Sequence, residues 1–104
     1  LSYLSYTLEY TKFIFWEGFS HMPDDNIGSR HQKFILELGS KQTLLVAHNI
    51  DLAPRISNLR VGDYIEFYGE YEWNSKGGVL HWTHRDPRNN HVHGWLKHKG
   101  LIYE

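Results

Sequence analysis

The segment from residue 63 to residue 73, DYIEFYGEYEW, constrains the fold more than any other part of the chain. Apolar and polar residues alternate along it, which is the pattern of a β-strand with one buried face and one wet face. The face expected in the core carries Ile65, Phe67, Tyr71 and Trp73. The face expected in water carries Tyr64, Glu66, Tyr68, Glu70 and Glu72. The segment therefore predicts a strand with one buried face and one face in water.

Four further segments are rich in aromatic and β-branched residues and predict strands, at 12–16, 33–38, 43–48 and 79–83. Between the third and fourth strands, Asp51 is suited to cap a short helix over about Asp51 to Leu59. Residues 1–11 are left unassigned, as either a strand or a short helix, and the tail from residue 93 is expected to be an edge strand or a short helix.

This order of elements predicts a mainly β fold. Five strands with one short helix between strands 3 and 4 are typical of a small OB-like barrel, a fold that binds oligonucleotides or oligosaccharides. A small β sandwich is the alternative. The fold alone does not define a function, because function depends on the site that a fold carries.

Size and composition limit the classes of protein that remain. A chain of 104 residues with 40% hydrophobic and 22% charged residues is expected to fold as a single domain, 1–104. The formal net charge of -1 argues against nucleic acid as a partner, and the absence of cysteine excludes disulfides and thiolate metal sites. No stretch has the length of a membrane span or the pattern of a secretion signal, so we expect neither a membrane protein nor a precursor.

Four sequence blocks from Met22 onward carry a resemblance to a known family: PDDNIGSRHQKF, LLVAHNIDLAPRI, GDYIEFYGEYEWNSKGG, and HWTHRDP followed by HGWLKHKG. Together they span roughly four fifths of the chain and resemble an uncharacterised bacterial family of unknown function, family 3465 of that series. The same family is found among mobile integron cassette proteins. The resemblance implies a bacterial protein, periplasmic or secreted where a signal precedes it and cytoplasmic otherwise, and it brings no known activity.

Histidine is concentrated near the C-terminus, where five of the eight histidines lie in the last 24 positions. Imidazole and carboxylate are ligands that zinc and similar ions accept, and a zinc-bound water is a nucleophile near neutral pH. The predicted metal set is His81, His84, Asp86 and His91, completed by His48 or His93. His81 and His84 are also the candidate catalytic residues of a metal-assisted or histidine-based hydrolase, of phosphodiesterase or nuclease type. The alternative is that these histidines are surface and loop-capping residues, since their spacing matches no standard metal motif.

Aromatic residues suggest a second kind of site. Tyr64 and Tyr68 belong to the wet face of their strand, and with Trp82 and Trp95 they could stack against a sugar ring or a base. The glutamates on the same face oppose a phosphate backbone. The preferred function is therefore a non-catalytic binding module for a neutral ligand, glycan or protein partner, with the hydrolase as the alternative. Whether the chain is an enzyme and whether it forms a homo-oligomer are left open.

Overall fold

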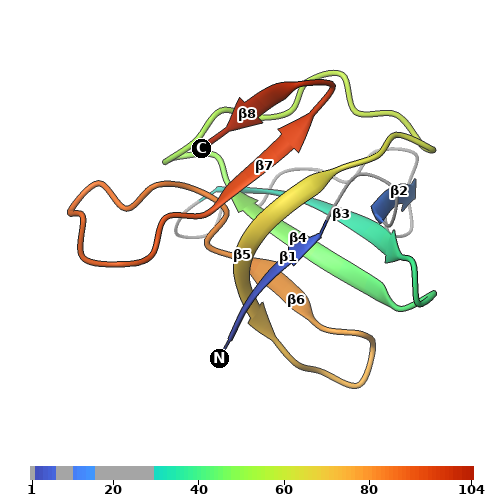
Figure 1. Cartoon of the computed structure of the whole chain (residues 1–104). Helices are drawn as coiled ribbons and strands as arrows, with labels where there is room; N and C mark the ends of the chain where they lie inside the picture. The colour runs from blue at the N-terminus through green and yellow to red at the C-terminus, as the bar shows by residue number, and fades with distance from the viewer. Residues whose placement is uncertain (1, 7–10, 16–29) are drawn as a thin grey trace.

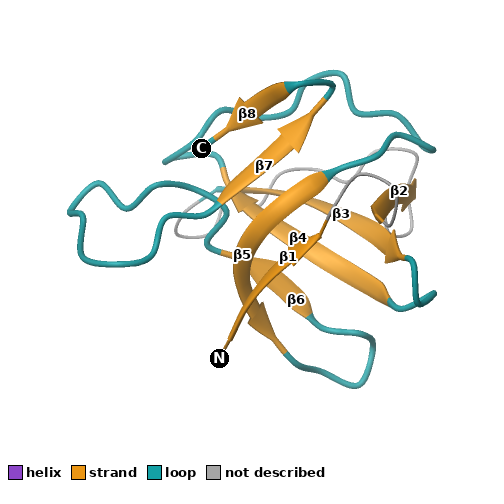
Figure 2. Ribbon diagram, viewed as in Figure 1, coloured by secondary structure: helices purple, strands orange, loops and turns teal. Residues whose placement is uncertain are grey.

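A computed structural model describes residues 2–6, 11–15 and 30–104. These residues form eight strands in one sheet and contain no helix (Figures 1 and 2). The strands are β1 (Ser2–Tyr6), β2 (Thr11–Phe15), β3 (His31–Leu38), β4 (Thr43–Asn49), β5 (Glu66–Glu72), β6 (Val79–His81), β7 (Trp95–His98) and β8 (Leu101–Tyr103). The prediction of a mainly β fold is confirmed. Among the described residues, there is no helix with the length and apolar character needed to span a membrane.

The sheet follows the order β2-β3-β4-β6-β5-β7-β8, and β1 pairs separately with β5. β4 and β6 run parallel, whereas the other strand pairs of the described residues are antiparallel. Figure 1 shows β5 curling through the middle of the sheet, so that the strands form a half-barrel. The five predicted strands correspond to β2 through β6. The three additional strands are β1, in a segment for which the sequence predicts no single element, and β7 and β8, which form a hairpin in the tail.

The β3–β4 hairpin confirms the two predicted strands that flank Gly39 and Ser40. Seven residues of β3 pair with β4 in unbroken antiparallel register from His31–Asn49 to Glu37–Thr43. Lys41 adopts a positive φ of 73°, and its N–H donates to the Leu38 carbonyl to close the turn. The hairpin is therefore fixed by a regular ladder, and it contributes several fully buried side chains to the core.

The core lies on the concave side of the sheet, as expected from the alternation of β5. Its buried members come from β3 through β7 and from the segment before β5: Phe34, Leu36, Leu38, Leu44, Val46, Ile56, Ile65, Phe67, Leu80 and Leu96. Trp73 corrects the prediction, because its side chain is 74% exposed rather than in the core. The β5–β6 ladder ends at Glu72, so Trp73 lies beyond the last paired residue of its strand.

The predicted helix over about Asp51 to Leu59 is not formed, and this segment consists of turns and irregular chain. The Leu52 and Ala53 N–H groups donate to the Asn49 carbonyl, but further along the segment the backbone bonds to side chains of the sheet. The Gln32 side chain accepts a hydrogen bond from the Ile56 N–H at 2.9 Å and donates to the Ile56 carbonyl at 2.8 Å. Ile56 is buried where Gln32 binds it, whereas the Leu52 side chain is 44% exposed. Leu52 and Ile56, whose spacing suggested one face of a helix, therefore lie in different surroundings, one in solvent and one in the core.

Candidate functional site

The parallel pair β4 and β6 sends two connecting segments to the same edge of the sheet. The turn at 50–53 follows β4, and the loop at 82–94 follows β6. A surface pocket of about 510 Å³ lies between them. Its lining residues are Leu52, Trp82, Asp86, Pro87, Arg88, Asn90 and His91. Three of the residues predicted for a site, Trp82, Asp86 and His91, thus line one pocket.

His48 lies at the base of this region and is fully buried. Burial lowers the pKa of its imidazole to about 4, so the ring is neutral at pH 7. Its Nε2–H donates to the Pro54 carbonyl at 2.8 Å, and its Nδ1 accepts from the Thr83 hydroxyl at 2.7 Å. Both ring nitrogens are engaged, so His48 ties the segment after β4 to the loop after β6.

Trp82 forms one wall of the pocket and is held in an uncommon conformation. Its φ is 59°, in the left-handed region that bulky residues rarely adopt. The indole stacks on the His91 ring with centroids 3.8 Å apart, and the tilted His84 ring lies 4.9 Å away. Its Nε1 is buried without a hydrogen-bond partner. Two histidines therefore position Trp82, and one of its faces is covered by His91.

His84 and Asp86 take part in the internal bonding of the loop. The buried His84 ring donates from Nδ1 to the Arg85 carbonyl at 2.7 Å. The Asp86 carboxylate accepts from the Arg88 N–H at 3.0 Å and from the Asn90 N–H at 2.9 Å. These backbone hydrogen bonds hold the pKa of Asp86 below its usual value.

His93 completes the bonding within this loop. Its Nε2–H donates to the Asn89 side-chain oxygen at 2.8 Å, and its Nδ1 accepts from the Asp86 N–H at 3.2 Å. The loop therefore has a defined conformation that depends on side-chain to backbone contacts.

His81 and His91 meet at a residue that the sequence did not single out as a site residue. Glu70 Oε2 lies 3.7 Å from His81 Nδ1, and Glu70 Oε1 lies 3.7 Å from His91 Nε2. His81 Nε2 is in turn 3.5 Å from a Glu72 carboxylate oxygen. The contact between Glu70 and His81 follows from their direct pairing across the β5–β6 ladder. The strand pairing was predictable, but the return of the loop that brings His91 back to Glu70 was not.

The four predicted metal ligands have different surroundings. His81 and His91 approach Glu70, His84 lies against Trp82, and Asp86 binds backbone N–H groups. Among the residues that the structure describes, no group of three or more His, Asp or Glu side chains could hold a metal ion. The geometry supplies no ready centre for zinc at these positions.

The aromatic candidates on β5 and β7 lie on the face of the sheet opposite to the buried Phe67 and Leu96. Tyr68 is directly opposite Trp95 in the antiparallel register, so their side chains project to the same side. Glu66 and Lys97 form the neighbouring pair, with 3.8 Å between the ammonium and the carboxylate. Tyr64 precedes β5 and is 47% exposed. We refer to Tyr64, Tyr68 and Trp95, with Glu66 and Glu70 beside them, as the β5–β7 face.

A family model described as "Protein of unknown function (DUF3465)" matches residues 17–104. The chain belongs to this family. No curated protein and no solved structure matches the DUF3465 chain. The family assignment confirms the resemblance seen in the sequence and assigns no reaction, ligand or partner.

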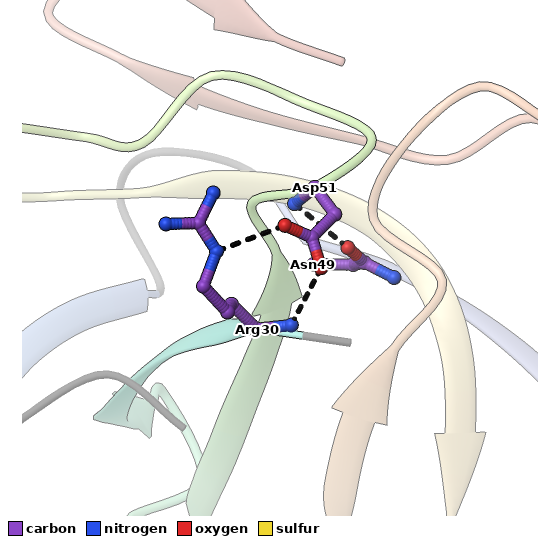
Figure 3. Close-up of polar contacts among 3 residues, drawn as sticks. All are labelled: Arg30, Asn49 and Asp51. Carbon is purple, nitrogen blue, oxygen red and sulfur yellow. Dashed lines mark hydrogen bonds and ion pairs between the residues drawn. The ribbon is translucent and has the colours of Figure 1, made fainter. Parts of the chain in front are cut away.

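The DUF3465 chain also holds a polar cluster that sequence reasoning assigned differently. Asp51 does not cap a helix; its carboxylate accepts from the Arg30 backbone N–H at 2.8 Å and from Arg30 Nε at 2.9 Å (Figure 3). The Asn49 side chain accepts from the Asp51 N–H at 2.9 Å. The hydrogen bonds from the Arg30 backbone and side chain lower the pKa of Asp51. This cluster fixes the start of the turn that carries Leu52 to the pocket.

Proposed function

We propose that the DUF3465 chain is a non-catalytic binding module that holds a neutral, hydroxyl-rich ligand such as a glycan on the β5–β7 face. The observation that carries this proposal is the placement of Tyr68 opposite Trp95 on one face, between the carboxylates of Glu66 and Glu70. Aromatic rings offer apolar surface to the C–H groups of a sugar, and carboxylates accept hydrogen bonds from its hydroxyls.

The charges on this face support a neutral ligand over a polyanion. Glu66 pairs with Lys97, whereas Glu70 lies near His81 and His91 and Glu72 lies near His81. A phosphate backbone requires clustered Lys and Arg. The face lacks that cluster, so single-stranded nucleic acid is disfavoured.

The sheet topology is compatible with an OB-like barrel, and we propose that closure as part of the same hypothesis. β1 pairs with β5 and β2 pairs with β3, so consecutive short strands contact two separate parts of the sheet. Only residues 7–10 separate these strands, and the chain there can span at most about 18 Å between Tyr6 and Thr11. This short connection limits the distance between β5 and β3 and supports the proposed closure of the half-barrel.

The test is a binding screen of neutral oligosaccharides, with calorimetry on any that are retained. We expect Tyr64→Ala and Trp95→Ala to weaken binding at least tenfold, since base or sugar stacking on an aromatic contributes about 1–3 kcal/mol. Trp73→Ala is the matched control, because it removes an exposed aromatic outside the face. Retention of a protein partner instead of a glycan would contradict the glycan proposal and assign the face to protein binding. Nanomolar binding of single-stranded DNA with steep salt dependence would contradict it.

A histidine-based hydrolase is the second proposal, and one observation favours it. Two imidazoles flank the carboxylate of Glu70, and imidazole is the side chain that most often serves as a general acid or base in catalysis. The measurement is hydrolysis of bis(p-nitrophenyl) phosphate with and without added zinc or manganese. The proposal expects turnover that His81→Ala or His91→Ala abolishes, and turnover that survives both variants would exclude it. A metal role further requires calorimetric zinc uptake that His84→Ala or His91→Ala removes.

A further inference from the structure

We infer that the pocket between the turn at 50–53 and the loop at 82–94 is a second binding site, which takes a ring compound bearing one carboxylate. It is distinct from the β5–β7 face, and the inference does not depend on the glycan proposal. Its support comes from the lining of the pocket, from its hydrogen-bonding groups, and from the conformation of Trp82.

The lining combines an apolar surface with a few polar groups. Leu52, Trp82 and Pro87 supply the apolar part, and Leu52 leaves nearly half of its surface in solvent. The exposed part of the Leu52 side chain is therefore apolar surface that a ligand in the pocket can cover. The volume of about 510 Å³ lies in the range of small-molecule sites. A compact ring would cover this surface without filling the pocket.

The hydrogen-bonding groups of the pocket favour an anion. Asp86 Oδ1 accepts from the Arg88 N–H and Asp86 Oδ2 accepts from the Asn90 N–H, so this carboxylate is directed toward the loop backbone. His91 Nε2 is turned toward Glu70. Within the described part of the chain, the Arg88 guanidinium makes no hydrogen bond or ion pair, although Arg88 lines the pocket. A guanidinium carries five donors in a planar fork that matches a carboxylate. The pocket therefore presents the N–H donors of the Arg88 guanidinium beside an Asp86 carboxylate that already binds the loop backbone.

Trp82 is the second line of support. A bulky residue at φ 59° and a buried indole N–H without an acceptor are each energetically unfavourable. Both occur in the residue that forms a wall of the pocket, where His84 and His91 hold the ring. Strain of this kind is concentrated at ligand sites, where it fixes a surface before the ligand arrives. The rigid wall would reduce the entropy lost on binding.

The experiment compares two probes that differ mainly in charge, sodium D-galacturonate and D-galactose, by calorimetry on the whole chain. We expect saturable binding of galacturonate and at least tenfold weaker binding of galactose, because a hydrogen bond to a charged group contributes on the order of a tenfold to hundredfold factor. Arg88→Ala should remove most of this preference, and Arg88→Lys should retain part of it. Arg60→Ala is the matched control, since Arg60 is exposed on the turn before β5, outside the pocket lining.

The outcomes separate this inference from the glycan proposal. Absence of galacturonate binding, or equal affinity for both sugars, overturns the pocket assignment. Galacturonate binding that Arg88→Ala leaves unchanged but Tyr64→Ala weakens assigns the sugar to the β5–β7 face and also overturns it. Binding that needs Arg88 and is unaffected by Tyr64→Ala supports the pocket, whatever the result of the neutral glycan screen.

Discussion

The β3–β4 hairpin and the loop after β6 are held in place by different kinds of interaction. The hairpin has an unbroken backbone ladder and buries one apolar row from each strand. The loop from 82 to 94 lacks a ladder and depends on side chains that bond to backbone groups, with Asp86, His84 and His93 as the main examples. The hairpin gains most of its stability from burial. The loop gains its shape from a small number of polar contacts, so single substitutions should affect the two regions in different ways.

The largest expected effect is in the hairpin. Phe34→Ala removes a fully buried aromatic side chain and should lower the free energy of unfolding by about 3–5 kcal/mol. Urea denaturation followed by tryptophan fluorescence measures this change. Trp73→Ala, at an exposed aromatic, should change it by no more than about 0.5 kcal/mol. A loss below about 1 kcal/mol for Phe34→Ala would show that the core does not depend on this hairpin.

The next effect concerns His48, where the hairpin and the loop meet. Because burial lowers its pKa from 6.5 to about 4, the unfolded chain binds a proton there more readily than the folded chain between those pH values. Its contribution is complete above pH 6.5 and is lost as the pH falls toward 4, by about 3 kcal/mol in total. Unfolding free energies at pH 7.5, 5.5 and 4.5 should show this fall.

Two variants isolate the contribution of His48. His48→Gln should flatten the pH dependence between 6.5 and 4.5 even if it lowers stability at every pH. Trp73→Ala, at an exposed position that carries no titratable group, should leave the slope as in the parent chain. An unchanged slope in His48→Gln would mean that other groups cause the acid sensitivity.

The smallest effect is local to the loop. Asp86→Ala removes the acceptor of the Arg88 and Asn90 N–H groups, so hydrogen exchange at these two amides should accelerate about tenfold. Exchange at Leu36 and Val46 in the hairpin should not change. If the hairpin amides also accelerate, the loop and the hairpin unfold as one unit, and the contrast between them fails.

The sequence predicted well where one physical rule dominates and poorly where several compete. Alternation along β5 correctly separated Phe67 from Tyr68, because burial on one face of a strand determines that pattern. The helix after Asp51 failed because Gln32 supplies hydrogen bonds to Ile56 from a neighbouring strand, which local spacing does not reveal.

Site residues show the same division. The position of His81 beside Glu70 follows from the antiparallel pairing of β5 and β6, two strands that the sequence predicted. The position of His91 does not, because it depends on how the loop returns. Loop shape is decided here by Asp86 and His93, whose bonds to backbone groups and to Asn89 leave no periodic pattern in the sequence.

The pairing of β1 with β5 has a consequence for the order in which the molecule assembles. Tyr6 pairs with Phe67, about 60 residues further along the chain, whereas β3 and β4 are joined by a turn of a few residues. Closing a long loop costs more chain entropy than closing a short one, so contacts between distant residues tend to form later. The β3–β4 hairpin is thus suited to start folding, and β1 can dock only after β5 has been synthesised and positioned. The first strand of the chain is therefore among the last to find its place.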